Sequence, residues 1–380
     1  MKVYLDNAAT TKVDENVLNA MLPYFSEEYG NPSSSHNLGQ EARRVLEEAR
    51  EKVAKKIGAN YKEVIFTGSG TEANNFALKG LFFSNYPKKN HIITTKIEHD
   101  CIMKTCKWLE TQDAKVTYLD VDKQGYINLE QLEKSINPQT IVVSIIHGNN
   151  EVGTIQNLSE IGKICKKKGV LFHSDACQSF TKVPINVKKQ NIDLMTINSH
   201  KIHGPKGVGA LYIKTGIKIT PLLHGGGHEF GLRSSTENTA GIVGFSKAIN
   251  SIGFFDLRKI KKTREYFLKR VKEISNIKIN GDTEKGLPNI INVCFMDIEA
   301  EALGSYLNGF GVYSSVGSAC SSHSHEPSHV LKAMGKTNLE INSSVRFSIS
   351  KYTTKEEIDY AIENLKKVVS KLRAMSPLSK

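Results

Sequence analysis

The sequence predicts an α/β protein with a large, mostly parallel sheet and a second, smaller α+β domain. Three observations lead to this prediction. Short apolar runs alternate with amphipathic stretches over the first two thirds of the chain, which is typical of parallel strands joined by helices. This pattern changes near residue 240, where longer helical stretches begin. The 380 residues are also too many for one small hydrophobic core.

Seven apolar runs are the expected strands of the large sheet. They lie at 64–67, 92–94, 116–119, 141–146, 170–175, 194–197 and 210–213. Helices are expected between them, among others from Thr71 to about 83, over 128–135 and over 158–168. In the second domain we expect a helical pattern over 241–277, strands at 289–293 and 344–349, and helices at 299–308 and 356–375.

Composition narrows the class of protein. No apolar run approaches the roughly 20 residues that a membrane span needs, and the N-terminal MKVYLDNAATT lacks the apolar core of a signal peptide. We therefore expect a cytoplasmic protein without a membrane segment. The net charge of +12 comes mostly from dispersed lysines, which favours a solvated surface over a nucleic-acid site. Six scattered cysteines without a CxxC pair indicate free thiols.

Lys201 is the first candidate for a catalytic group. It follows the strand 194–197, and the turn-forming residues Gly204, Pro205 and Gly207 come shortly after it. Partial burial lowers the pKa of an amine and makes it available as a nucleophile. Asp175 ends another apolar strand, 26 residues earlier. A lysine for the aldehyde and an aspartate for the pyridinium nitrogen are the two protein groups that pyridoxal 5'-phosphate (PLP) most needs.

Polar candidates follow five of the predicted strands. Thr71, His99, the pair at 149–150, the pair Asp175 and Gln178, and Lys201 each come just after a strand end. Ligands of parallel α/β sheets bind beyond the carboxyl ends of the strands. We therefore expect these side chains to meet at one edge of the sheet.

The turn Gly68-Ser69-Gly70-Thr71 joins a strand to a helix. Free N–H groups at a helix start and a Thr hydroxyl favour an anion such as phosphate, although the same residues also suit an ordinary helix start. His99 is either a loop histidine or, beside a PLP site, a group that stacks on the pyridine ring and moves protons. The glycine-rich segment 224–238 permits close approach of backbone to a ligand or to a neighbouring subunit.

Cys320 lies in a small, polar loop, whereas we interpret the other five cysteines as packing thiols. Nearby histidines favour its thiolate. Cys320, His323, His325 and His329 are also potential metal ligands, but their spacing matches no closed tetrahedral site, so we expect no dedicated metal. Arg346, in an apolar strand pattern, needs a carboxylate partner, which is either an internal acid or the α-carboxylate of a substrate.

With these residues in hand, the chain resembles the cysteine desulfurases of the NifS/IscS type, which are class V aminotransferases among the fold-type I PLP enzymes. The resemblance covers nearly the whole chain, and its lysine, GSAC-loop and arginine motifs are highly specific. The matching segments are YLDNAATT (4–11), YGNPSSSH (29–36), FTGSGTEANN (66–75), EHDC (98–101), HGNNEVGTIQ (147–156), HSDACQ (173–178), SHKIHGPKGVGALY (199–212), HGGGHEFGLRSSTEN (224–238), VGSACSS (316–322), EPSHVLKAMG (326–335) and SVRFSIS (344–350).

The resemblance implies a role for each residue around the PLP ring. Lys201 holds PLP as an imine, and Asp175 pairs with the pyridinium nitrogen. Gln178 and Asn150 contact the phenolic oxygen and its surroundings. His99 stacks on the ring and serves acid–base chemistry.

The resemblance also implies a phosphate site and a homodimer. Gly70, Thr71, His200 and the backbone of Asn198 and Ser199 surround the phosphate, and Thr236 reaches it from the partner subunit. The same resemblance implies a large domain at 14–256 and a small domain that combines 1–13 with 257–380.

For the substrate, the resemblance implies that Arg346 binds the carboxylate of L-cysteine, with Asn150 and Asn31 nearby. The Cys320 thiolate attacks the substrate sulfur and leaves as a persulfide, which releases L-alanine. A sulfur-acceptor protein is then expected, for iron–sulfur cluster assembly or for thiolation pathways. Cys320 also remains a possible transient ligand of an iron–sulfur intermediate.

The chain departs from the family pattern at several places. Asn198 stands where the family usually has Ser, so we expect an altered phosphate geometry and retained binding. Ser235 replaces a usual glycine and Val316 a usual serine, and both changes are expected to shift loop dynamics. The segment after Cys320 resembles the NifS/IscS group more than the SufS group. The chain stops at Lys380, where members that dock a scaffold protein often continue, which leaves the acceptor open.

Two alternatives stay open at this point. One is a related PLP enzyme, such as a selenocysteine lyase or an aminotransferase, which needs no persulfide thiol. The other is a sulfur-relay or scaffold protein that binds PLP structurally, and the intact set of Lys201, Asp175, His99, Cys320 and Arg346 argues against it.

Overall fold

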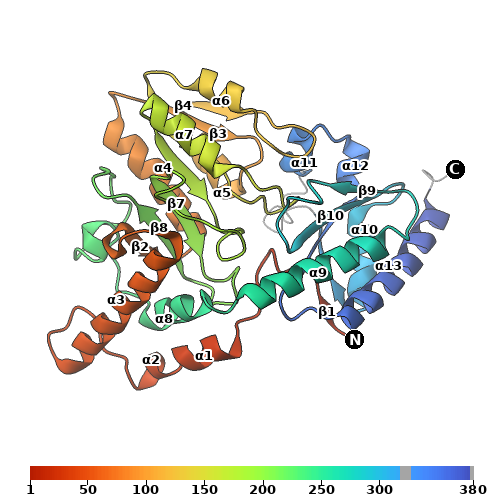
Figure 1. Ribbon diagram of the computed structural model, residues 1–380, viewed down its shortest axis with the longest axis horizontal. Helices are drawn as coiled ribbons and strands as arrows, with labels where there is room; N and C mark the ends of the chain where they lie inside the picture. Colours follow the sequence, from red (N-terminus) through yellow and green to blue (C-terminus); the bar gives the residue numbers. More distant parts are fainter. Residues whose placement is uncertain (317–326, 377–380) are drawn as a thin grey trace.

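The computed structural model of the protein describes residues 1–316 and 327–376. A seven-stranded sheet forms the centre of its larger part, with the strand order β2-β8-β7-β6-β5-β3-β4 (Figure 1). The strands are Val64–Thr67 (β2), His91–Thr95 (β3), Lys115–Leu119 (β4), Thr140–Ser144 (β5), Leu171–Asp175 (β6), Leu194–Asn198 (β7) and Gly209–Ile213 (β8). Only β8 runs antiparallel to its two neighbours, β2 and β7. The predicted α/β fold with a large, mostly parallel sheet is confirmed.

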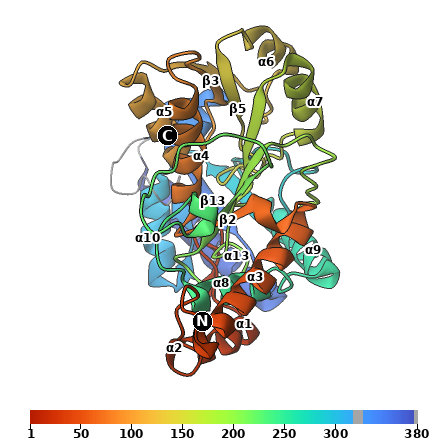
Figure 2. The ribbon, with the colours of Figure 1, turned by 90° about the vertical axis from the view of Figure 1, so that its left-hand side faces the viewer.

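Helices bury both faces of this sheet, which explains why the strands read as continuous apolar runs. In β8, Ala210 and Tyr212 pack into the core beneath α3 and α8, whereas Leu211 and Ile213 pack into the core beneath α4 and α5. Figure 2 shows α4 and α5 on one side of the sheet and α7 on the other. The helices of this part are Glu15–Met21 (α1), Pro23–Ser26 (α2), Asn37–Ile57 (α3), Gly70–Asn85 (α4), Asp100–Glu110 (α5), Leu129–Ser135 (α6), Leu158–Lys168 (α7) and Thr239–Ala248 (α8), with the short turns Tyr61–Glu63 (η1) and Glu229–Gly231 (η2).

The predicted helical pattern over 241–277 is wrong in its extent. Helix α8 ends at Ala248 and α9 spans Phe254–Val271, while Ile277–Asn280 is a strand, β9. Gly253 separates the two helices with an extended backbone, and its N–H donates to Oδ2 of Asp256 at 2.9 Å. A glycine at this position weakens the helix, and the side chain of Asp256 starts a new one.

A second sheet, with the strand order β12-β13-β10-β9, forms the smaller part of the molecule. Its strands and the adjoining pair β1·β11 are Val3–Tyr4 (β1), Ile290–Phe295 (β10), Val312–Tyr313 (β11), Ser315–Val316 (β12) and Ser344–Ser348 (β13). Its further helices are Ala300–Gly309 (α10), His329–Ala333 (α11), Asn338–Asn342 (α12) and Lys355–Met375 (α13). Within the described range no helix has the length and apolar content to cross a bilayer.

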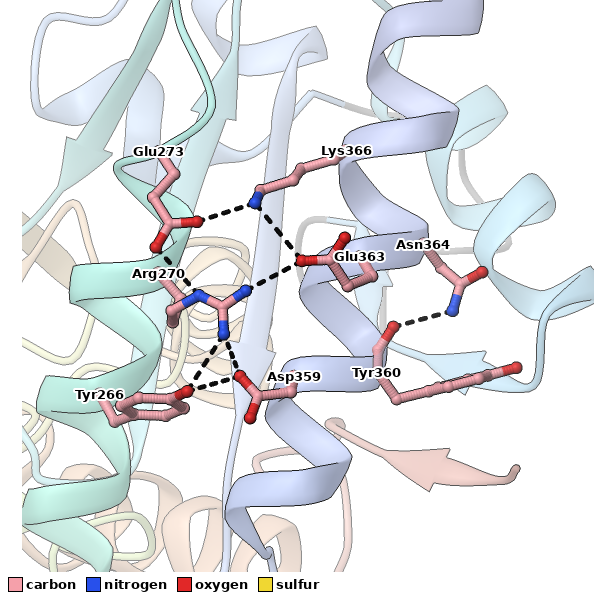
Figure 3. A network of polar contacts seen from close by, with 8 residues as sticks. All are labelled: Tyr266, Arg270, Glu273, Asp359, Tyr360, Glu363, Asn364 and Lys366. Carbon is pink, nitrogen blue, oxygen red and sulfur yellow. Dashed lines mark hydrogen bonds and ion pairs between the residues drawn. The ribbon is translucent and has the colours of Figure 1, made fainter.

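Helices α9 and α13 lie side by side and are joined by a network of charges (Figure 3). The guanidinium of Arg270 contacts the carboxylates of Asp359, Glu363 and Glu273, and Lys366 donates to Glu273 at 2.8 Å. Most of these side chains are partly exposed, so each pair stabilises the contact only modestly.

The N-terminal segment runs from the small sheet to the large one. Strand β1 pairs in parallel with β11, and Asp6 forms a bridge with Ser348 of β13. Further along, the N–H of Asp14 donates to the carbonyl of His203 at 2.9 Å, on the large part. The domain division at 1–13, 14–256 and 257–380 remains a proposal, and its second boundary falls in the first turn of α9.

Candidate active site

A cleft lies where the carboxyl ends of the parallel strands meet the small sheet. Ten of the residues predicted from the sequence line it: Gly70, Thr71, His99, Asn150, Asp175, Gln178, Asn198, His200, Lys201 and Arg346. Five strands of the large sheet, β2, β3, β5, β6 and β7, therefore deliver polar groups to one place, as expected for a parallel sheet.

Of the other predicted residues, three described ones do not line this cleft. The hydroxyl of Ser199 is buried against Gly204, where a Cβ atom would come within 2.0 Å of it. Thr236 lines a neighbouring hollow together with Gly68 and Arg233. Asn31 is exposed, and its Oδ1 accepts a hydrogen bond from the N–H of Ser33 at 2.9 Å. Cys320 lies outside the described residues.

Lys201 reaches the cleft from a tight turn that follows β7. The N–H groups of Ile202 and Gly204 both donate to the carbonyl of Ser199, which fixes the turn. The Nζ atom of Lys201 donates to the carbonyls of Ala8 and Ala9, at 2.6 Å for Ala9. The N-terminal segment therefore holds the amine at the edge of the cleft.

Asp175 ends β6, and two donors fix its carboxylate. Nδ2 of Asn74 donates to Oδ2 at 2.7 Å, and the N–H of Cys177 donates to Oδ1 at 2.9 Å. Asp175 is 5% exposed and lines the cleft. A buried carboxylate held by hydrogen bonds is a fixed negative charge, suited to a cationic nitrogen of a ligand.

His99 caps α5 and thereby fixes its own tautomer. Its Nδ1 accepts a hydrogen bond from the N–H of Cys101 at 3.2 Å, which leaves the ring proton on Nε2. Burial of the imidazole lowers the pKa of His99 and outweighs the nearby Asp175 carboxylate, which acts in the opposite direction. The ring is therefore neutral at pH 7.

The start of α4 forms the other end of the cleft. The Ser69 hydroxyl caps the helix by accepting from the N–H of Glu72 at 3.0 Å, so α4 begins at Gly70, one residue before the predicted Thr71. The first-turn N–H groups of a helix have no carbonyl one turn earlier and attract anions. A Cβ atom at Gly70 would lie 2.6 Å from Sγ of Cys177, so only glycine leaves this helix start, the phosphate cradle, open for an anion.

Buried polar atoms without a partner point to a missing ligand. In the described chain, no hydrogen bond is made by five buried atoms of cleft residues: Oδ1 of Asn74, Oδ1 of Asn150, Oε1 of Gln178, Oδ1 of Asn198 and Nε of Arg346. Buried polar groups are nearly always satisfied in a working protein. Together with the amine, the fixed carboxylate and the helix N-terminus, these atoms fit a polar, phosphorylated pyridine such as PLP.

Arg346 enters the cleft from β13 of the small sheet. Its Nη1 donates to the carbonyl of Asn150 at 2.8 Å and its Nη2 to Oδ1 of Asp6 at 2.9 Å. The arginine is 1% exposed, and a buried guanidinium with an open edge is suited to a carboxylate.

Six cleft residues were not predicted: Ala8, Ala9, Asn74, Cys101, Ile146 and Cys177. Ser69, which also lines the cleft, belongs to the turn that is expected to favour an anion. Asn74 lies one helical turn after Gly70, and this spacing is a signal that places both on one face of α4. The interpretation of five cysteines as packing thiols is wrong for Cys101 and Cys177, which are only partly buried and line the cleft. Burial still raises the pKa of the Cys101 thiol to about 12, and that of Cys177 well above the ordinary value.

Comparisons with known proteins agree with this geometry. The model of the family "Aminotransferase class-V" matches residues 3–361. A relative from Dictyoglomus turgidum named cysteine desulfurase IscS is 46% identical over 99% of this chain and 96% of its own length. A solved NifS-like protein is 40% identical, with a TM-score of 0.92 over 98% of this chain and all of the other. The structure titled "SspA in complex with cysteine" is 36% identical, with a TM-score of 0.85 over 93% of this chain and all of the other.

Proposed function

This chain belongs to the class-V aminotransferase family, and from that premise we propose that it is a cysteine desulfurase that takes sulfur from L-cysteine. The observation that supports this most is the convergence of Lys201, Asp175 and His99 with Arg346 of the other sheet in one cleft. The amine, the fixed carboxylate and the neutral imidazole serve a PLP enzyme, and the arginine adds a site for an amino-acid carboxylate.

We propose that the cleft holds PLP. Lys201 would attach it, Asp175 would face its ring nitrogen, and the side-chain amides of Gln178 and Asn150 would lie beside its phenolic oxygen. The start of α4 at Gly70 and Thr71, with Asn198, Ser199 and His200, would hold the phosphate. Bound PLP supplies an electron-withdrawing ring that weakens bonds around the Cα atom of an amino acid.

Residues of the chain then orient the substrate, transfer protons and accept the sulfur. Arg346 orients the substrate by its carboxylate, because a planar guanidinium pairs with a carboxylate in a defined geometry. The neutral imidazole of His99 accepts or donates a proton beside the substrate. The thiolate of Cys320 attacks the substrate sulfur, so that the carbon–sulfur bond breaks and a sulfur–sulfur bond forms. L-cysteine and the Cys320 thiol thus become L-alanine and a Cys320 persulfide, and atoms balance.

The persulfide requires an acceptor, for which we propose a protein of iron–sulfur cluster assembly or of a thiolation pathway, in the cytoplasm. We also propose a homodimer. Thr236 lies in a hollow beside Gly68 and outside the cleft of its own chain, and this position leaves it available to the phosphate site of a second subunit. Asn31, exposed in its own chain, is proposed to contact substrate.

The test measures L-alanine and sulfide formed from L-cysteine, with dithiothreitol present to reduce the persulfide. The purified protein is compared with Cys320→Ala, Lys201→Ala and the control Cys165→Ala, whose thiol is buried in the core at 0% exposure. We expect the wild type to form L-alanine and sulfide in equal amounts, and the Cys165→Ala control to do the same. Neither product is expected from Cys320→Ala, although this variant retains the visible absorbance of bound PLP.

A Cys320→Ala variant that equals the wild type would show that no persulfide forms on this thiol. A lyase or aminotransferase would then replace the desulfurase as the assignment. Sulfur release that persists in Lys201→Ala would instead favour a sulfur-relay protein.

A further inference from the structure

Asp6 forms an ion pair with Arg346, the residue that is proposed to bind the substrate carboxylate. Its Oδ1 accepts a hydrogen bond from Nη2 of Arg346 at 2.9 Å. Arg346 lines the cleft, its side chain is 2% exposed and that of Asp6 is 20% exposed, so the pair is largely shielded from solvent. A carboxylate of the protein therefore already accepts from a guanidinium N–H group that a substrate carboxylate would use.

The remaining contacts of Arg346 leave one edge of the guanidinium open. Nη1 donates to the carbonyl of Asn150, and the buried Nε has no partner in the described part of the chain. A carboxylate that binds side-on uses Nε and Nη2 together. Such a ligand takes the open Nε and must share Nη2 with Asp6.

The backbone holds Asp6 in this position. Asp6 forms a bridge with Ser348, the side chain of Asn7 donates to the carbonyl of Ser348 at 2.8 Å, and the N–H of Ala8 donates to its hydroxyl at 2.8 Å. Asp6 therefore has only side-chain rotation available when a substrate arrives. Its charge stays near the substrate carboxylate after binding, and like charges in a partly buried site repel.

Two other ionisable groups lie near Arg346 without a hydrogen bond to its guanidinium in the described chain. Glu151 is buried, burial raises the pKa of its carboxyl while Arg346 acts in the opposite direction, and the carboxyl accepts from the hydroxyl of Ser328. Burial likewise raises the pKa of Tyr4, so this phenol stays protonated. Among the described residues, Asp6 is the acid in hydrogen-bond contact with the guanidinium.

We propose that Asp6 is an internal carboxylate that competes with the substrate carboxylate for Arg346 and thereby lowers the affinity of the site for amino acids. This proposal rests on the proposed role of Arg346. Asp6 neutralises the buried guanidinium of Arg346 in the free enzyme. It thereby weakens the binding of every amino acid whose carboxylate pairs with that guanidinium. The amino-acid product therefore leaves more easily.

The test is calorimetric binding of L-alanine and of ethylamine, which is L-alanine without its carboxylate, to the PLP-loaded protein. Asp6→Asn keeps an oxygen acceptor for Nη2 and removes the charge. We expect Asp6→Asn to bind L-alanine more tightly, on the order of tenfold, and ethylamine as the wild type does. The matched control is Asp120→Asn, which removes the same charge from an acid that is 64% exposed and paired with Lys96. This control is expected to bind both ligands as the wild type does.

The variant Arg346→Met tests the proposed carboxylate-binding role of Arg346 independently of the proposed competition by Asp6. Loss of the preference for L-alanine over ethylamine in Arg346→Met establishes the carboxylate site. With that result, unchanged or weaker binding of L-alanine by Asp6→Asn overturns the competition proposal and makes Asp6 an orienting residue. An Arg346→Met protein that binds L-alanine as the wild type does would instead refute the role of Arg346 itself.

Discussion

The guanidinium of Arg50 and the carboxylate of Glu229 form a two-hydrogen-bond ion pair that is closed off from solvent. The two bonds are 2.6 and 2.9 Å long, and both side chains are 2% exposed. Glu229 also accepts from the N–H of Phe66 at 2.8 Å, and the rings of Phe66 and Phe230 lie on the guanidinium. This pair anchors the glycine-rich loop, which contains Thr236, to α3 and β2.

Arg50→Met is expected to destabilise the protein far more than Arg270→Met. Removal of Arg50 leaves Glu229 charged and buried, which costs about 3–5 kcal/mol. The acids around Arg270 stay partly solvated when that residue is lost, so the cost there is about 1 kcal/mol or less. Urea unfolding of both variants measures the difference, and equal midpoints would contradict the view that the buried pair dominates.

Asp175→Asn is expected to lower cysteine desulfuration by at least about a hundredfold, because it removes the fixed charge and keeps the side-chain shape. Asn74→Ala removes one of the two donors to Asp175 and is expected to cost about tenfold, since a hydrogen bond to a carboxylate is lost. The control is Asn75→Ala, on the same helix, whose amide bonds the carbonyl of Thr71. Steady-state rates with L-cysteine provide the comparison, and an Asn74→Ala rate equal to that of the control would remove Asn74 from the site.

Gly70→Ala is expected to abolish tight PLP binding. The new Cβ atom would lie 2.6 Å from Sγ of Cys177 and 3.5 Å from Nδ2 of Asn198, inside the cradle. The double variant Gly70→Ala/Cys177→Ala removes the sulfur and is expected to regain part of the affinity. PLP titration followed by absorbance measures both, and full affinity in the single variant would place the phosphate elsewhere.

Glu98 is expected to make the protein less stable as the pH rises. The side chain is fully buried, and burial raises the pKa of its carboxyl from its ordinary value of 4.5 to about 8. The folded state therefore holds a proton that the unfolded state has already released, and stability falls between about pH 4.5 and pH 8.

Glu98→Gln removes this proton linkage. The stability of the variant relative to the wild type is expected to increase from pH 5 to pH 8 by more than about 1 kcal/mol and then to level off. Urea midpoints at pH 5, 7 and 9 test this, with Glu130→Gln on the exposed side of α6 as a control. Parallel pH profiles for the wild type and Glu98→Gln would show that Glu98 ionises normally.

The large sheet and much of the cleft follow directly from the amino-acid sequence. Strands buried on both faces leave continuous apolar runs, and the residues after them meet at one edge in any parallel sheet, so the sequence alone predicts that Asp175 and Lys201 share one site. The same local reasoning was wrong over 241–277, because the helical pattern continues across the break at Gly253.

The distant groups that complete the site depend on tertiary packing. Asp6 and Arg346 are 340 residues apart, and Arg50 and Glu229 are 179 apart. Neither pair leaves a periodic pattern, because each contact depends on how separate elements pack and not on the spacing within one element. The carbonyls of Ala8 and Ala9, which accept from the Lys201 amine, were equally hard to predict. Every residue has a backbone carbonyl, so the residue type does not show which carbonyls contribute to a site.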